Sequence, residues 1–178
     1  HVEPIVAADF SPMRRELARA EGAHAVVDPR ERPAIEAYRE LGHLRPTALF
    51  ECVGVPGVLD QIMRQAPLGS RIVVAGVCME TDTIWPMVGI NKELNVQFVF
   101  AYQPQEFAAT LQAIAEGQIR VAPLVTGRVG VDGVARAFDD LRQPDAHAKI
   151  LVEPWRYTPS LETGRDRTLR IARQPRSG

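Results

Sequence analysis

A carboxylate placed to bind a ribose stands near the start of the chain. Asp9 follows an apolar run, and Ser11-Pro12 comes next with the features of a helix start. An acidic residue at such a strand end can accept hydrogen bonds from both hydroxyls of an adenosine ribose, and it would repel the extra phosphate of NADP. The pattern predicts the second half of a dinucleotide-binding βαβ unit.

The glycine part of this fingerprint does not accompany Asp9. A Gly-rich turn that cradles the pyrophosphate is expected about 20 residues before the acidic residue. The numbering starts at His1, so that turn has no counterpart here. We therefore expect part of an enzyme, with the ribose-reading portion present and the pyrophosphate loop absent.

The elements around Asp9 alternate between short apolar runs and amphipathic stretches, which is typical of a parallel sheet covered by helices. The first helix is expected from Ser11 to Gly22, with further helices at 34–41, 58–66, 107–115 and 134–141. The expected strands are 5–8, 25–27, 47–52, 71–75, 96–101 and 149–152. This order predicts an α/β fold, an incomplete Rossmann-like doubly wound parallel sheet without its first strand and Gly-rich turn.

Composition restricts the class of protein. The net charge is −1 and 46% of residues are hydrophobic, which fits a soluble globular protein without the basic excess that nucleic acid binding requires. No apolar run approaches the roughly 20 residues that span a bilayer, and no leader is recognisable. Cys52 and Cys78 do not form a CxxC pair, so a reduced, cytoplasmic chain is expected.

An excess of positive charge lies at the end of the chain. From Trp155 onward there are six arginines against Glu162 and Asp166, and apolar periodicity is lost. We expect a partial NAD(P)-binding domain over 1–154, ending in a return strand, and a basic, disordered tail over 155–178.

Three segments carry a resemblance to one family. The segments are Glu51-Cys52-Val53-Gly54, Val73-Val74-Ala75-Gly76-Val77 and Ala148-Lys149-Ile150-Leu151-Val152. The ordered set resembles the C-terminal half of the zinc-dependent alcohol dehydrogenases of the medium-chain dehydrogenase/reductase superfamily, over residues 2–154. The segment from Asp9 to Arg15 is typical of bacterial members of this family.

The resemblance implies cofactor contacts and no catalytic residue in this chain. Asp9 would bind the ribose hydroxyls, with the basic Arg14 close by. The remaining contacts would lie along the adenine, nicotinamide-ribose and nicotinamide side, at Val53, Gly54, Ala75, Gly76, Val77, Phe98, Val99 and Phe100. The backbone of the last six residues would reach the nicotinamide and its carboxamide.

The resemblance also implies the chemistry of the parent enzyme, which is oxidation of an alcohol or polyol with hydride transfer to NAD. In this family a zinc ion polarises the alcohol oxygen, and its Cys, His and acidic ligands belong to the N-terminal half. The four histidines of this chain are scattered and no pair has metal-site spacing. We therefore expect no metal site here and little or no turnover by the isolated chain.

Other functions stay open on the sequence. Arg14 and Arg15 keep NADP open as the cofactor, since arginine beside this site can bind a 2′-phosphate. A zinc-free, NADPH-dependent quinone reductase is a related alternative, which the Asp9 carboxylate argues against. A non-catalytic α/β remnant or a partner-binding module is the alternative from a different class.

Strand order predicts two structural consequences. The strands before Asp9 and before Cys52 should flank a central strand, so the chain is expected to be destabilised, to pair these two strands directly or to self-associate. The edge at 96–101, with Val96, Phe98 and Phe100, resembles the region through which relatives dimerise. Glu51 ends a buried strand, where a carboxylate needs hydrogen-bond partners.

Overall fold

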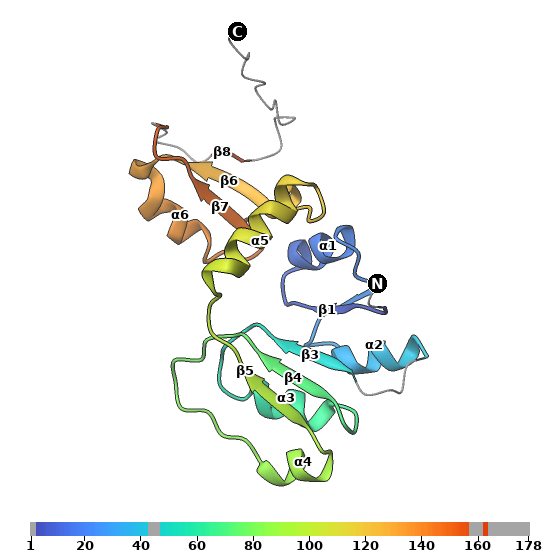
Figure 1. Cartoon of the computed structure of the whole chain (residues 1–178). Coiled ribbons are helices and arrows are strands. Elements are labelled where there is room, and N and C mark those ends of the chain that lie inside the picture. The colour runs from blue at the N-terminus through green and yellow to red at the C-terminus, as the bar shows by residue number, and fades with distance from the viewer. Residues whose placement is uncertain (1–2, 43–46, 157–161, 164–178) are drawn as a thin grey trace.

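The computed structural model describes residues 3–42, 47–156 and 162–163 (Figure 1). Within them the strands are β1 Val6–Ala8, β2 Ala25–Val27, β3 Ala48–Glu51, β4 Arg71–Val74, β5 Asn95–Phe98, β6 Val125–Val129, β7 Lys149–Val152 and β8 Glu162–Thr163. The α-helices are α1 Pro12–Ala20, α2 Ala34–Glu40, α3 Val58–Gln65, α4 Pro86–Asn91, α5 Pro104–Ala115 and α6 Val134–Asp140. No helix of these residues is long and apolar enough to cross a membrane.

The strands form three small sheets instead of one. β1 and β2 are parallel, β3, β4 and β5 are parallel in that order, and β6 lies between a parallel β7 and an antiparallel β8. The α/β class and the parallel, Rossmann-like arrangement are confirmed. The sheet is interrupted where the strand order requires a further strand between β1 and β3.

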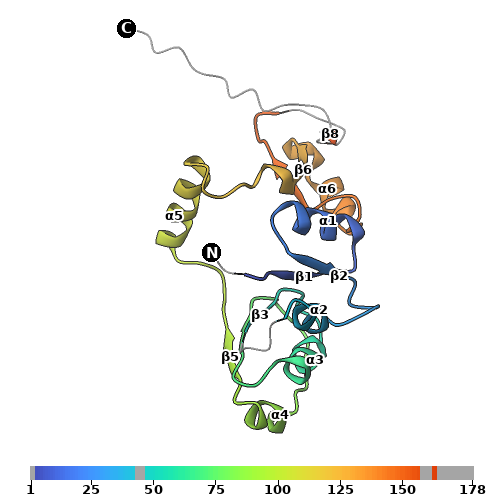
Figure 2. The same cartoon turned by 90° about the vertical axis from the view of Figure 1, so that its right-hand side faces the viewer.

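The first sheet lies between two helices, the arrangement of a doubly wound fold. Figure 2 shows α1 and α2 on opposite sides of the β1–β2 pair. Helix α1 begins because the Ser11 side chain accepts a hydrogen bond from the Arg14 N–H and Pro12 occupies the first turn. Ser11 is buried, and its hydroxyl also donates to the Pro144 carbonyl, which joins this turn to the segment before β7.

The second sheet contains a hydrophobic core. Leu49, Ile72 and Val96 are side by side in the register of β3, β4 and β5, and they face the same side of the sheet. Leu59 and Met63 of α3 and Val88 of α4 pack against that side. The opposite side carries Phe50, which is 65% exposed, so helices cover only one face of this sheet.

Two strand edges face no hydrogen-bonded partner. β1 is bonded only to β2, and β3 only to β4, and these two strands are not paired with each other among the described residues. Of the three expected outcomes, direct pairing of the flanking strands is therefore not the one adopted here. The core cluster draws only on β3 to β5 with α3 and α4, so it does not extend across the interruption.

Several elements differ from the sequence prediction. β5 ends at Phe98, three residues early, and β6 and α4 were not predicted. Val96, expected on an exposed edge, is half-buried against the core because it faces α3 and α4. In the segment expected to be a disordered tail, Glu162–Thr163 pair with Arg128 and Gly127 of β6, while 157–161 and 164–178 lie outside the described residues, as do His1 and His43.

Helix α5 stands away from the sheets (Figure 2). Its start is fixed by a capping box, in which the Gln103 side chain and the Glu106 side chain each satisfy the other residue's backbone N–H. Phe107 and Leu111 lie on one face of the helix and are 55% and 58% exposed. The described residues therefore leave the apolar face of α5 uncovered.

The stability of the middle sheet, formed by β3, β4 and β5, should depend on Ile72, which is completely buried. We expect Ile72→Ala to lower the free energy of unfolding by about 2–5 kcal/mol, since it removes buried methyl groups and leaves a cavity. The neighbouring Val73→Ala, on the uncovered face, is the matched control and should cost no more than about 1 kcal/mol. Urea denaturation of both variants measures this, and equal losses would contradict the one-sided core.

Candidate functional site

Asp9 lies where the sequence predicts it, directly after β1. The backbone N–H of Ser11 donates to Asp9 Oδ1 at 2.8 Å, and Arg14 Nη1 is 3.9 Å from Oδ2. The Asp9 side chain remains 36% exposed. One carboxylate oxygen is thus held by the helix start, and the side chain keeps surface available for hydroxyl donors.

A buried ionic network holds the turn that carries Asp9. Arg15 Nη1 donates to the carbonyls of Asp9 (2.7 Å) and Phe10 (2.9 Å) and to Asp28 Oδ2 (3.1 Å). Arg30 donates through Nε to Asp28 Oδ1 at 2.8 Å and through Nη2 to Oδ2 and to the Phe10 carbonyl at 3.1 Å. Asp28 therefore joins the turn after β1 to the turn after β2.

Asp28 is ionised throughout the neutral range. The side-chain hydrogen bonds from Arg30 hold the pKa of this carboxyl well below its usual range, the Arg30 N–H and the Arg15 charge add to the effect, and burial opposes it. The sequence analysis missed Asp28 as a site residue. The available signal was its position, because Asp28-Pro29 follows β2 as Asp9 follows β1.

The turns after β3 and β4 touch through their backbones. Gly54 has a φ of +72°, and a Cβ built there would lie 2.6–2.8 Å from the backbone of Val77. A Cβ on Gly76 would lie 2.4 Å from the Gly54 nitrogen. Both glycines are needed for this close approach at the carboxyl ends of adjacent parallel strands, where open α/β sheets bind ligands.

Some of the backbone groups expected to face a nicotinamide are already bonded. The N–H groups of Ala75 and Gly76 donate to the Glu51 carbonyl at 2.8 and 2.9 Å, and the N–H of Val99 donates to the Val74 carbonyl at 3.0 Å. These three donors are taken up within the fold. A ligand here could still contact the carbonyls, the side-chain surface and the amides that are not bonded in this way.

Phe98 and Phe100 are 71% and 88% exposed at the end of β5. The predicted contact residues after β3, β4 and β5 are therefore brought to one end of the middle sheet, linked by the Val99–Val74 bond and the Gly54–Val77 contact. Asp9 follows β1 of the first sheet and Arg14 lies in α1, and the hydrogen bonds and ion pairs of these two residues among the described residues stay within this first unit.

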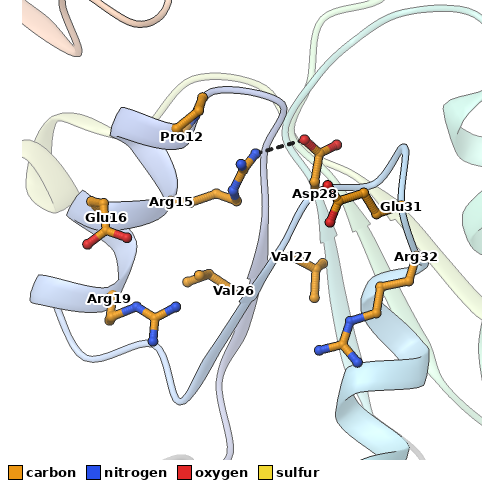
Figure 3. A pocket seen from close by; sticks show the side chains of 9 residues that line it. All are labelled: Pro12, Arg15, Glu16, Arg19, Val26, Val27, Asp28, Glu31 and Arg32. Carbon is orange, nitrogen blue, oxygen red and sulfur yellow. Dashed lines mark hydrogen bonds and ion pairs between the residues drawn. The ribbon is translucent and has the colours of Figure 1, made fainter.

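A cavity of about 280 Å³ lies between α1 and β2 (Figure 3). Arg19 of α1 and Arg32, which precedes α2, point into it from opposite sides, and the ion pair Arg15–Asp28 also lines it (Figure 3). None of the ten predicted cofactor-binding residues lines this cavity. It lies beside the turn that carries Asp9, because Arg15 donates to the Asp9 carbonyl.

The structure offers no donor set for zinc in the part of the chain it describes. Over residues 3–42, 47–156 and 162–163, no group of three or more His, Cys, Asp or Glu side chains could hold a metal ion. Both cysteines are free thiols. Partial burial raises the pKa of the Cys52 thiol, and the Glu51 charge raises it further, which disfavours the thiolate.

Comparison with known proteins assigns the chain to a family. The sequence pattern of the zinc-binding dehydrogenases matches residues 2–116, more than half of the chain. The chain therefore belongs to the zinc-binding dehydrogenase family, and it corresponds to the C-terminal portion of these medium-chain enzymes, as the resemblance predicted.

Individual relatives are similar over most of this chain. (R,R)-butanediol dehydrogenase from Neisseria gonorrhoeae is 27% identical over 154 residues, which cover 84% of this chain and 43% of that protein. The crystal structure of 2R,3R-butanediol dehydrogenase from Bacillus subtilis has a TM-score of 0.72 and 29% identity, covering 85% of this chain and 44% of the other. A zinc-binding dehydrogenase from Sinorhizobium meliloti 1021, bound to NADP, has a TM-score of 0.72 and 28% identity, with 86% and 46% covered. The chain thus spans less than half the length of these relatives.

Stability should depend on pH through Asp28. Because its pKa is lowered in the folded state, the carboxylate stabilises the fold above the ordinary Asp pKa of about 4, and this contribution is lost as the pH falls through the folded-state pKa. We expect Asp28→Asn to be less stable than the wild type at pH 7, with the difference shrinking below about pH 4. Urea denaturation across this range measures it. The control Glu40→Gln, which breaks a surface pair with Arg32, should change little at any pH.

Proposed function

We propose that this chain is the cofactor-binding portion of an NAD-dependent alcohol or polyol dehydrogenase. The family and the class of reaction come from the zinc-binding dehydrogenase match and from relatives such as the butanediol dehydrogenases. The observation that carries the proposal is the Asp9 carboxylate, held by the Ser11 N–H at the carboxyl end of β1 and still open to hydroxyl donors.

NAD is the cofactor we propose, although the Sinorhizobium relative was solved with NADP. A 2′-phosphate would meet the negative charge of Asp9 and would need a free cation to offset it. Three arginines contact the turn at Asp9 and Phe10: Arg15 and Arg30 are both bonded to Asp28, and Arg14 lies 3.9 Å from the Asp9 carboxylate. This distribution of charge favours a ribose with two free hydroxyls.

The remaining contacts are proposed for the strand ends of the middle sheet. The residues are Val53, Gly54, Ala75, Gly76, Val77, Phe98, Val99 and Phe100, toward the nicotinamide side. In support, the close approach of Gly54 to Val77 aligns two of these turns. Zinc ligation, the proton relay and substrate recognition are assigned by the same proposal to the part of the dehydrogenase that this chain does not span, so the chain alone should have little or no turnover.

We also propose residues 1–154 as the nucleotide-binding domain and 155–178 as a basic tail, in a cytoplasmic protein. A homodimer through the segment 96–101 is proposed for the same chain. In support, within the described part of the chain β5 is hydrogen-bonded to β4 on one side and to no strand on the other, and Phe98 and Phe100 at its end are largely exposed.

Cofactor binding is tested by thermal unfolding with and without millimolar NADH. Ligand that binds the native state raises the unfolding midpoint by mass action, by about 2.7 kcal/mol of stability at 100 times the Kd. We expect an upward shift with NADH, a smaller one with NADPH, and loss of the NADH shift in Asp9→Ala. Asp139→Ala, which removes an exposed carboxylate paired with Arg142, is the control and should keep it. If NADH does not change the thermal unfolding midpoint of the wild type, the proposal is overturned.

Self-association is tested by light scattering at micromolar concentration. We expect twice the chain mass of 19.7 kDa for the wild type, and the monomer mass for Phe98→Lys, because a charge at this edge opposes strand pairing. Phe138→Lys on α6 is the matched control, since the two aromatic rings are 71% and 69% exposed. A monomeric wild type would contradict the proposed dimer.

A further inference from the structure

Glu51, the last residue of β3, has a buried carboxylate that the proposed cofactor contacts do not include. The residue is 4% exposed and follows Leu49 on the side of the sheet that carries the core. A buried carboxylate is unfavourable unless hydrogen bonds replace its water. Oε1 of Glu51 accepts the N–H of Val53 at 2.6 Å and the N–H of Gly54 at 2.8 Å. The hydrogen-bonding role expected from the sequence is thus confirmed.

The same residue also holds the neighbouring turn. Its backbone carbonyl accepts the N–H groups of Ala75 and Gly76. Glu51 therefore makes four hydrogen bonds, two to the turn after β3 through its side chain and two to the turn after β4 through its backbone.

Space around the carboxylate is limited by the facing turn. A Cβ on Gly76 would lie 2.5 Å from Glu51 Oε2 and 2.9 Å from Oε1. The carboxylate thus fills the volume under Gly76, between the two turns. Adjacent backbone N–H groups in a turn form a natural anion site, and here the chain's own carboxylate occupies it.

We propose that Glu51 is a positioning residue that fixes the turn Val53–Gly54 against the turn Ala75–Val77. It would act on the cofactor only through these turns, by holding their backbone at the spacing that the nicotinamide side requires. That consequence rests on the proposed function, whereas the hydrogen-bond arrangement does not. An experiment can therefore contradict the effect on cofactor binding without contradicting the hydrogen-bond arrangement, and the reverse.

Amide hydrogen exchange of the full chain, followed by NMR, tests the arrangement without cofactor. In the wild type the N–H groups of Val53 and Gly54 should exchange slowly although they lie outside helix and strand. Glu51→Ala should accelerate both by about tenfold or more, as expected for loss of a hydrogen bond to a charged group. Glu51→Gln should keep the protection, since its side-chain oxygen still accepts.

If Glu51→Ala only lowered the stability of the whole fold, the amides of β4 would exchange faster as well. We expect the β4 amides to stay protected in Glu51→Ala, so that only the two turn amides are affected. Fast exchange of Val53 and Gly54 in the wild type would overturn the proposal even if Glu51→Ala does not fold. Unchanged exchange of these two amides in Glu51→Ala would overturn it as well.

NADH titration of the same proteins tests the consequence. Glu51→Ala should bind about tenfold or more weakly, Glu51→Gln should approach the wild type, and the control Glu153→Ala, which loses partners Arg128 and Arg156 in another sheet, should not change. Equal NADH affinity of Glu51→Ala and wild type would overturn the positioning role. If the wild type itself does not bind NADH, the proposed function fails, and the exchange data alone decide the role of Glu51.

Discussion

Backbone hydrogen bonding at two strand edges determines how this chain is organised. A parallel strand inside a sheet is bonded on both sides, because unpaired N–H and C=O groups are costly once water is excluded. Among the residues that the structure describes, β1 and β3 each have one bonded side, and no strand pairs with their other edges. The interruption separates a βαβ unit that carries Asp9 from a second unit that carries the hydrophobic core, so the two ends of the proposed cofactor site belong to different sheets.

Most of the local structure could be predicted from the sequence. The runs at 25–27 and 149–152 are strands with the predicted bounds, and Ser11-Pro12 starts a helix as expected. β6 was missed because Gly127 and Arg128 interrupt its apolar run, although Val125, Gly127 and Val129 alternate on one face. The division into three sheets could not be derived, because local pattern determines strands but not which strands remain without a partner.

The sequence predicted that the candidate residues lie at strand ends, but not how their backbone groups are bonded. The strand-end residues after β3 to β5 are at one end of a sheet, as the parallel order requires. Sequence alone did not indicate that three of their amides are taken up by neighbouring carbonyls, or that Asp28 connects Arg15 and Arg30. These contacts depend on distances across adjacent turns, which residue types and spacing do not encode.

The hydrophobic cluster of the middle sheet is built from one segment of the chain, and this has a consequence for biosynthesis. All of its members lie between Leu49 and Val96, a single uninterrupted stretch of chain. Domains generally fold from the N-terminal side as the polypeptide leaves the ribosome. This unit can bury its apolar side chains as soon as β5 has emerged from the ribosome, before β6 and β7 emerge. From that moment the edge of β5 that has no hydrogen-bonded strand is exposed to other nascent chains.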